Sequence, residues 1–209
     1  MNKLLIYGAS YPDIAYLLED VNTASPTWDI VGVVDDTSEE SEFMGYPIVG
    51  DHEVLSNKAY RSCAVLNNVF SRPAARAQVA ERIRAAGLAP ATCVHPSVKT
   101  QRADIGAGVV VMEGARIGAR AVLGDWVTVR YNAIINHDNV LDEFVFVGPG
   151  AVFCGHVQVG RNAYVGAGSV VRERLRIGVG ATVGMGSVVV RDVEEGATVW
   201  GNPARPKEV

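Results

Sequence analysis

The dominant pattern of the chain is an apolar residue at every sixth position. All fifteen such positions, from Ile105 to Val189, hold Ile, Leu, Val or Phe, and the fourth residue after each is mostly small. Glycine often follows the apolar residue directly. Neither an α-helix nor an ordinary strand repeats every six residues, so the period itself predicts the fold.

A six-residue unit makes an extended side of roughly 20 Å, and three such sides close a triangular coil. The large apolar residues point inward, and each coil hydrogen-bonds to the next. The register is unbroken from 105 to 189, which predicts a prism without inserted loops. Residues eighteen apart should therefore stack, with His137 over Gly155 and Asp138 over His156.

The N-terminal part follows other periods. Lys3–Tyr7 reads as a buried strand, and the apolar spacing of residues 14–21 predicts a helix, with Ser10 and Asp13 as a weak variant of the capping box. Residues 30–34 form a second strand that ends at the acids of residues 35–36. Further strands are expected at 46–50 and 64–66, and a helix at 72–86.

These elements predict an α/β domain with a carboxylate at the end of its second strand, as in nucleotide-binding half-domains. Only Gly8 of the glycine signature is present, so Asp35 and Asp36 have the alternative interpretation of merely ending a strand. We place the boundary near residue 90. A small Rossmann-like α/β domain (1–90) then precedes an all-β parallel β-helix (91–209).

Composition narrows the class of protein. The 209 residues are 48% hydrophobic and 20% charged, with a formal net charge of −4, which offers no basic field for nucleic acid. No segment approaches the roughly 20 apolar residues of a membrane span, and the apolar run at the start is too short for a signal peptide. Three cysteines without CxxC spacing indicate neither disulfides nor a zinc site, so we expect a cytoplasmic protein.

One six-residue unit carries polar side chains at positions where an ordinary unit of the repeat would have glycine or alanine. In residues 135–140 (INHDNV), His137 lies in the middle of the prism beside Asp138. A neutral imidazole is the usual group that removes a proton from an attacking amine or hydroxyl, and Asp138 could fix its tautomer. The alternative interpretation is that His137 is a surface residue on a polar corner.

The motifs together resemble a known family. The aliphatic-Gly-x-x-small-x hexads resemble the left-handed β-helix of the hexapeptide-repeat acyltransferases. The segments HPSV, NHDNV and GNPAR, with IYGAS, VGVVDD and GYPIVG near the N-terminus, narrow the resemblance to the sialic acid O-acetyltransferases and PglD-like nucleotide-amino-sugar N-acetyltransferases. It covers nearly the full length.

The resemblance implies a reaction and its residues. A histidine matching His137 is the general base, Asp138 assists it, and the Gly155 amide helps to hold the thioester carbonyl of acetyl-coenzyme A, without a covalent acyl-enzyme or a metal. The implied coenzyme A contacts are Gly155, Gly184, Gly201, Asn202, Pro203, Ala204, Arg205 and Lys207. Arg205 and Lys207 also have the alternative interpretation of a solvated basic end.

The implied acceptor is a UDP-, GDP- or dTDP-linked 4-amino-4,6-dideoxy sugar. The small domain would hold this sugar through Gly8, Ser10 and Asp35 or Asp36. The resemblance also implies a homotrimer with active sites between subunits. Two features depart from the family: residues 10–12 (SYP) replace its glycine-rich loop, and Phe146 stands where some members have a second histidine.

Three other functions are alternatives. O-acetylation of a sugar hydroxyl would use the same fold and base. A carbonic anhydrase on this architecture needs three convergent histidines, and the prism offers His137 and His156 with His95 at its entrance. A non-catalytic nucleotide-sugar-binding scaffold would bind the sugar without affinity for coenzyme A.

Overall fold

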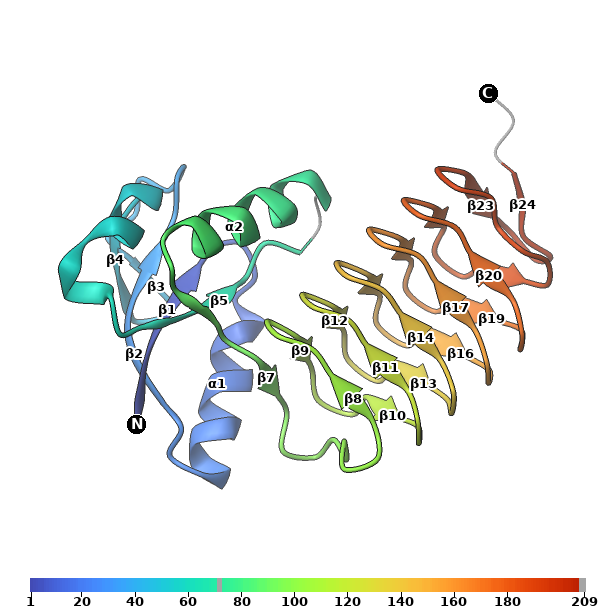
Figure 1. Ribbon diagram of the computed structural model, residues 1–209, viewed down its shortest axis with the longest axis horizontal. Coiled ribbons are helices and arrows are strands. Elements are labelled where there is room, and N and C mark those ends of the chain that lie inside the picture. The colour runs from blue at the N-terminus through green and yellow to red at the C-terminus, as the bar shows by residue number, and fades with distance from the viewer. Residues whose placement is uncertain (71–72, 207–209) are drawn as a thin grey trace. The chain divides into compact units, whose positions relative to one another are not determined.

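The computed structural model describes residues 1–70 and 73–206 of the chain. The chain divides into two compact units, Met1–Cys93 and Val94–Val209. Figure 1 shows the helices in the first unit and the stacked coils of the second. In the part of the chain that the structure describes, no helix is both long and apolar enough to cross a membrane.

The first unit is built on a six-stranded sheet in the order β3-β4-β2-β1-β5-β6. The neighbours pair in parallel except β3 with β4. The elements of this unit are β1 (Asn2–Tyr7), α1 (Asp13–Ala24), β2 (Trp28–Val34), β3 (Glu42–Phe43), β4 (Tyr46–Gly50), the 3-10 helices η1 (His52–Ser56) and η2 (Lys58–Tyr60), β5 (Ala64–Asn67), α2 (Pro73–Ala85) and β6 (Ala89–Pro90).

The four expected strands and both expected helices are confirmed, with described ends that differ by at most three residues. The expected start of the second helix, residue 72, lies outside the described residues. The expected capping box is wrong. Pro12 precedes α1 with a helical backbone, and no side chain caps the helix. The N-cap is two residues after Ser10, so Asp13 is the first residue of the helix and not the third, where a capping box would need it.

The carboxyl ends of β1, β2 and β5 meet at one edge of this sheet. The chain leaves β1 toward β2 on one side and places β5 on the other side, so the strand order reverses between β1 and β5. Ligands of open α/β sheets bind at such a reversal. Gly8, Asp35 and Asn68 each follow directly after one of these strands, so this edge is where a ligand of the first unit is expected.

The second unit is a triangular prism of short, mostly parallel strands in three sheets. The strands are β7 (Cys93–Val94), β8 (Asp104–Ile105), β9 (Val110–Val111), β10 (Arg116–Ile117), β11 (Val122–Leu123), β12 (Thr128–Val129), β13 (Ile134–Ile135), β14 (Val140–Leu141), β15 (Phe146–Val147), β16 (Val152–Phe153), β17 (Gln158–Val159), β18 (Tyr164–Val165), β19 (Val170–Val171), β20 (Arg176–Ile177), β21 (Thr182–Val183), β22 (Val188–Val189), β23 (Thr198–Trp200) and β24 (Arg205–Pro206).

Each strand from β8 to β19 pairs with the strand eighteen residues later, as the six-residue period predicts. The inward positions form one continuous core, in which Val129, Ile135 and Phe153 are fully buried. Small residues such as Ala133 and Ala151 fill the corners. The uninterrupted register confirms the expected prism without inserted loops and fixes which side chains share a corner.

Candidate active site

One corner of the prism gathers charged side chains from successive coils. Arg120, Asp138, His156 and Arg174 occupy equivalent corner positions and all adopt a left-handed backbone, with φ between 59° and 62°. Each corner amide donates to the carbonyl oxygen of the preceding coil; for example, the His156 N–H bonds to the His137 oxygen at 3.2 Å. The stacking of residues eighteen apart is therefore as expected.

His137 is held in one orientation by this corner. Its Nδ1 lies 2.6 Å from Oδ2 of Asp138. Because an ionised carboxylate only accepts, Nδ1 carries the hydrogen and Nε2 keeps a free lone pair. The preceding residue is also fixed, since the Asn136 side chain donates to the Phe153 carbonyl at 2.8 Å. His137 is half-exposed and presents a base to solvent on a rigid turn.

Arg120 is a partner of Asp138 that the sequence reasoning missed. Its Nε and a terminal nitrogen each donate to a different oxygen of Asp138 at 2.7 Å. The hydrogen bonds from Arg120, and then that from His137, hold the pKa of the Asp138 carboxyl far below its usual range. Asp138 therefore stays ionised at every physiological pH, and it can stabilise an imidazolium at His137.

Gly155 lies against the His137 ring. A Cβ built at Gly155 would come within 2.7 Å of Cε1 and 2.9 Å of Nε2 of His137. Among the residues described, no acceptor takes the Gly155 N–H, while its carbonyl accepts from Arg174 at 3.1 Å. An imidazole nitrogen and an unengaged amide are thus adjacent, the arrangement required of a base and an oxyanion donor.

His156 completes the cluster. Its Nε2 lies 3.7 Å from Oδ2 of Asp138, and its ring meets that of His137 edge-on with centroids 5.3 Å apart. Ligand atoms of the two histidines and Asp138 lie within 4.8 Å of one another. Arg120 already pairs with both oxygens of Asp138, so a cation would have to displace it. His95, the third histidine that a carbonic anhydrase would need, is buried with Nδ1 2.8 Å from Oγ of Ser97, and this donor set does not fit that function.

A groove adjoins the base on the same prism unit. It has a volume of about 520 Å³ and is lined by β10, β13 and the turns beside them, with Lys99, Arg116 and Asn136 among its polar residues. Asn136 directly precedes His137, so the groove leads to the base. Two exposed cations along it favour an anionic ligand.

The C-terminal segment folds back onto the last coil. β24 pairs antiparallel with β23 through a turn at Gly201 to Ala204, which contains a cis Asn202–Pro203 bond. The Gly201 carbonyl and the Ala204 amide both bond to Val188. Gly184 belongs to this region, since its amide donates to Val199 at 2.8 Å.

The expected coenzyme A residues from Gly184 to Arg205 therefore lie together, about three coils beyond His137, or roughly 14 Å along the prism. Lys207, also expected there, lies outside the described residues.

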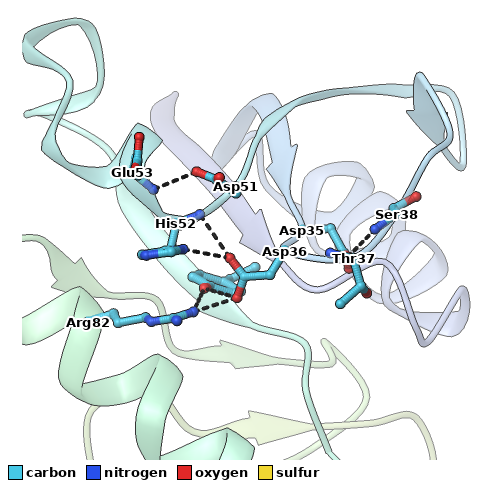
Figure 2. Close-up of polar contacts among 9 residues, drawn as sticks. Asp35, Asp36, Thr37, Ser38, Asp51, His52, Glu53 and Arg82 are labelled. Carbon is cyan, nitrogen blue, oxygen red and sulfur yellow. Dashed lines mark hydrogen bonds and ion pairs between the residues drawn. The ribbon is translucent and has the colours of Figure 1, made fainter.

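In the first unit, Asp35 ties together the turns after β1 and β2. Its Oδ2 accepts from the Ala9 amide at 2.7 Å, and its Oδ1 accepts from the amides of Thr37 and Ser38 at 2.8 Å (Figure 2 shows Thr37 and Ser38). Partial burial raises the pKa of the Asp35 carboxyl, but these bonds outweigh it and lower the pKa. Asp35 shapes the loop that starts at Gly8, and Ser10 lies exposed beyond it.

Asp36 is the centre of a second polar cluster, which Figure 2 shows between Arg82 and His52. Oδ2 accepts from the Tyr7 hydroxyl at 2.8 Å and from Arg82, and Oδ1 faces the amide and Nδ1 of His52 at 3.0 and 2.9 Å. Burial raises the pKa of Asp36, but the bonds from Tyr7, Arg82 and His52 bring it to about 2. Both oxygens of Asp36 are occupied, so Arg82 and His52 are the outward-facing groups of this cluster.

Sequence reasoning missed these partners, and also Asn68 at the end of β5. Asn68 is fully buried and donates to the carbonyls of Gly8 at 2.9 Å and Tyr11 at 3.2 Å. Its Oδ1 has no hydrogen-bond partner within the described residues. The only sequence signal for Asn68 was its position directly after a strand at the point where the strand order of the sheet reverses. Phe146, in place of a second histidine, stacks on Tyr164 at 4.9 Å.

Comparison with known proteins agrees with this geometry. Residues 140–173 match the bacterial transferase hexapeptide (six repeats) model. The acetyltransferase domain of PglB from Neisseria gonorrhoeae is 31% identical, with 99% of this chain and 100% of that chain covered and a TM-score of 0.89. This chain belongs to the hexapeptide-repeat sugar acetyltransferases. The prism is therefore the left-handed parallel β-helix of that family, and the protein is an acetyltransferase rather than a non-catalytic scaffold.

Two other solved structures extend the likeness over the whole chain. A histidine variant of perosamine N-acetyltransferase from Caulobacter crescentus, in complex with CoA and GDP-perosamine, is 26% identical over 100% of this chain and 98% of that chain, with a TM-score of 0.91. WeeI from Acinetobacter baumannii is 25% identical over 98% and 99%, with a TM-score of 0.84. Among curated proteins, none matches significantly.

Proposed function

We propose that this acetyltransferase moves the acetyl group of acetyl-coenzyme A to the amino group of a nucleotide-linked 4-amino-4,6-dideoxy sugar. The observation that carries the proposal is the pairing of His137, whose Nε2 is free, with the unengaged amide of Gly155. Similar structures that contain CoA with GDP-perosamine, or acetyl coenzyme A, support this choice of substrates.

In the proposed mechanism, His137 removes a proton from the amine as its nitrogen attacks the thioester carbonyl. Asp138, itself held by Arg120, keeps the ring in the reactive tautomer and stabilises the imidazolium. The Gly155 N–H donates to the oxyanion that forms, a contribution of about 3 kcal/mol per donor in other enzymes. The nitrogen–carbon bond forms, the carbon–sulfur bond breaks, and His137 returns its proton to the departing thiolate.

Coenzyme A would extend from this corner toward the C-terminal segment. The turn at Gly201 to Ala204 and Gly184, directly after β21, lie on the last coils, where Arg205 is exposed and suited to a phosphate. The roughly 14 Å between the base and this turn fits an extended ligand whose thioester is at one end. The protein contributes alignment and a base, while the acyl carrier chemistry belongs to coenzyme A.

The nucleotide part of the acceptor is assigned to the carboxyl edge of the first unit. Gly8 and Ser10 begin the loop after β1, and Asp35 fixes its shape. Asp36 would act by holding Arg82 and His52 toward the ligand, because its own oxygens are occupied. The nucleotide-sugar acceptor and acetyl-coenzyme A are metabolites of the cytoplasm, where we place the enzyme.

We further propose a homotrimer with active sites between subunits. The prism exposes apolar side chains on its outer surface, at Val140, Val170 and Val179, which a neighbouring prism would cover. Light scattering on the purified protein tests this assembly. Three chains of 22.3 kDa should elute together, and a monomer would contradict it.

The test of the reaction is thiol release from acetyl-coenzyme A with a panel of UDP-, GDP- and dTDP-linked amino sugars. His137→Ala should lower kcat by between about 100- and 10,000-fold on the accepted sugar, because it removes the general base. Gln101→Ala, at the equivalent position two coils earlier, is the matched control and should retain activity. Turnover only with hydroxyl acceptors would replace the proposal by O-acetylation, and normal kcat in His137→Ala would refute the base.

A further inference from the structure

The stoichiometry of the reaction sets a requirement that a single base does not meet. An alkyl amine is mostly an ammonium ion at neutral pH. Its acetylation therefore releases one proton to solvent before attack and moves a second from nitrogen to sulfur during the reaction. If His137 took the first proton, it would be positively charged at the moment when it has to accept the second.

The corner contains a second imidazole in a suitable place. His156 directly follows Gly155, and its backbone amide bonds to His137 at 3.2 Å, so its position relative to both residues is fixed. Its ring packs edge-on against the His137 ring, and it is half-exposed to solvent. A proton that reached His156 could leave directly into water.

Asp138 lies close to both histidines. Oδ2 accepts from Nδ1 of His137 at 2.6 Å and faces Nε2 of His156 at 3.7 Å. Nε2 of His156 lies too far from Oδ2 for a hydrogen bond but close enough for the carboxylate to stabilise an imidazolium at His156, and Nδ1 is the ring nitrogen left to take a proton. Among the described residues, no side chain or backbone group occupies that Nδ1.

The charges around His156 come from three coils. Asp138 and His137 face it from the preceding coil, and Arg120 reaches it only through Asp138. Arg174 occupies the equivalent corner one coil later, and Glu173 follows the hexad register beneath Gly155. An imidazolium at His156 would thus have the carboxylate of Asp138 as its nearest charge.

We propose that His156 is the proton-release residue of this enzyme: it takes a proton from the acceptor's ammonium group and passes it to solvent, so that the neutral amine reaches His137. The balance is R–NH₃⁺ plus acetyl-S-CoA giving R–NH–acetyl, CoA-SH and H⁺, with the released H⁺ leaving through His156. This role rests on the proposed function, because a hydroxyl acceptor brings no such proton.

The experiment compares the wild type with His156→Asn and His156→Gln, using the amino sugar that the panel identifies. In the variants kcat/KM for the sugar should fall about 10-fold near pH 7 and recover as the pH rises toward about 10, where an alkyl amine becomes neutral. Added imidazole should restore part of the loss near pH 7, and the KM for acetyl-coenzyme A should not change. Arg174→Gln, at the same corner one coil later, is the matched control and should keep the wild-type pH profile.

Three outcomes would overturn the role. A loss of equal size at every pH would mean that His156 only supports the structure, as would a loss that imidazole does not relieve. Unchanged kcat/KM near pH 7 would mean that solvent alone takes the proton. Failure of the proposed function is distinguishable, since the wild type would then release no thiol with any amino sugar, and the role of His156 would fall with it.

Discussion

At the residue scale, the catalytic corner depends on contacts between side chains one coil apart. Asp138 reaches back to Arg120, while Gly155 lies against the His137 ring and directly precedes His156. The backbone amide of each corner residue is fixed by a hydrogen bond to the preceding coil. Substitutions here should therefore change geometry at the base more than they change folding.

Arg120→Gln should lower kcat by between about 10- and 100-fold, because Asp138 loses the two hydrogen bonds that fix it and His137 loses its orientation. The pKa of the Asp138 carboxyl should rise toward its usual range when the hydrogen bonds from Arg120 are removed. Steady-state kinetics at neutral pH measure the effect on kcat. Arg102→Gln, one coil earlier at the same corner, is the control. An equal loss of kcat in this variant would show that the positive charge of the corner matters, and not the two hydrogen bonds from Arg120 to Asp138.

Gly155→Ala should lower kcat about 100-fold, since the new Cβ would lie within 2.9 Å of the reactive nitrogen and displace the ring. The same substitution in a His137→Ala background should cost little, because no ring is left to displace. A double-mutant cycle on kcat measures this coupling. Equal losses in both backgrounds would show that Gly155 acts through its own amide alone.

At the scale of the element, a buried asparagine supports the turn that carries the base. Asn139 takes a core position where most coils have alanine or valine, and it is fully buried. Its Oδ1 accepts from the Val157 amide at 2.7 Å, and its side-chain nitrogen donates to the Asn136 carbonyl at 2.9 Å. The coil of β14 is thereby tied both to the next coil and to the turn before His137.

Asn139→Ala should destabilise the protein by about 2 to 4 kcal/mol, because the buried Val157 amide and the partly buried Asn136 carbonyl lose their partners. For a chain of this size that corresponds to a fall in Tm of roughly 5 to 15 °C, measured by thermal unfolding. Ser169→Ala, which removes one bond to the Gly184 carbonyl, is the control and should cost less. An equal Tm in the two variants would contradict the special role of Asn139.

How far the sequence predicts each element depends on whether its contacts are periodic. The prism follows from a six-residue period, and the same arithmetic that stacked Asp138 over His156 places Arg120 one coil before Asp138, where it could have been found. Asp36 contacts Tyr7, Arg82 and His52, which lie 29, 46 and 16 positions away from it in the sequence. These separations follow no period, so no sequence pattern indicates the cluster. The capping box failed because a local motif was outweighed by the proline beside it.

At the scale of the whole molecule, the two units keep their structure by different means. The prism rests on a continuous apolar core and a regular ladder of backbone bonds, neither of which changes with protonation. The first unit depends in part on ionised carboxylates, since Asp35 and Asp36 each collect several donors at the ends of its central strands. Both α-helices among the described residues belong to this unit, so a helical signal in circular dichroism reports on it alone.

Acid should therefore affect the helical signal first. Asp36 has a folded-state pKa of about 2, below its value in the unfolded chain, so its stabilisation is complete above about pH 4 and is lost as the pH falls toward 2. Because the cluster is partly exposed and solvent screens it, we expect a contribution of about 1 kcal/mol. Denaturant unfolding monitored by the helical signal between about pH 5 and pH 2 measures it. Asp36→Asn should be less stable at neutral pH, and its free energy of unfolding should depend less on pH, whereas the control Glu39→Gln should change neither property. If the pH dependence in Asp36→Asn equals that of the wild type, the acid sensitivity belongs to other carboxylates.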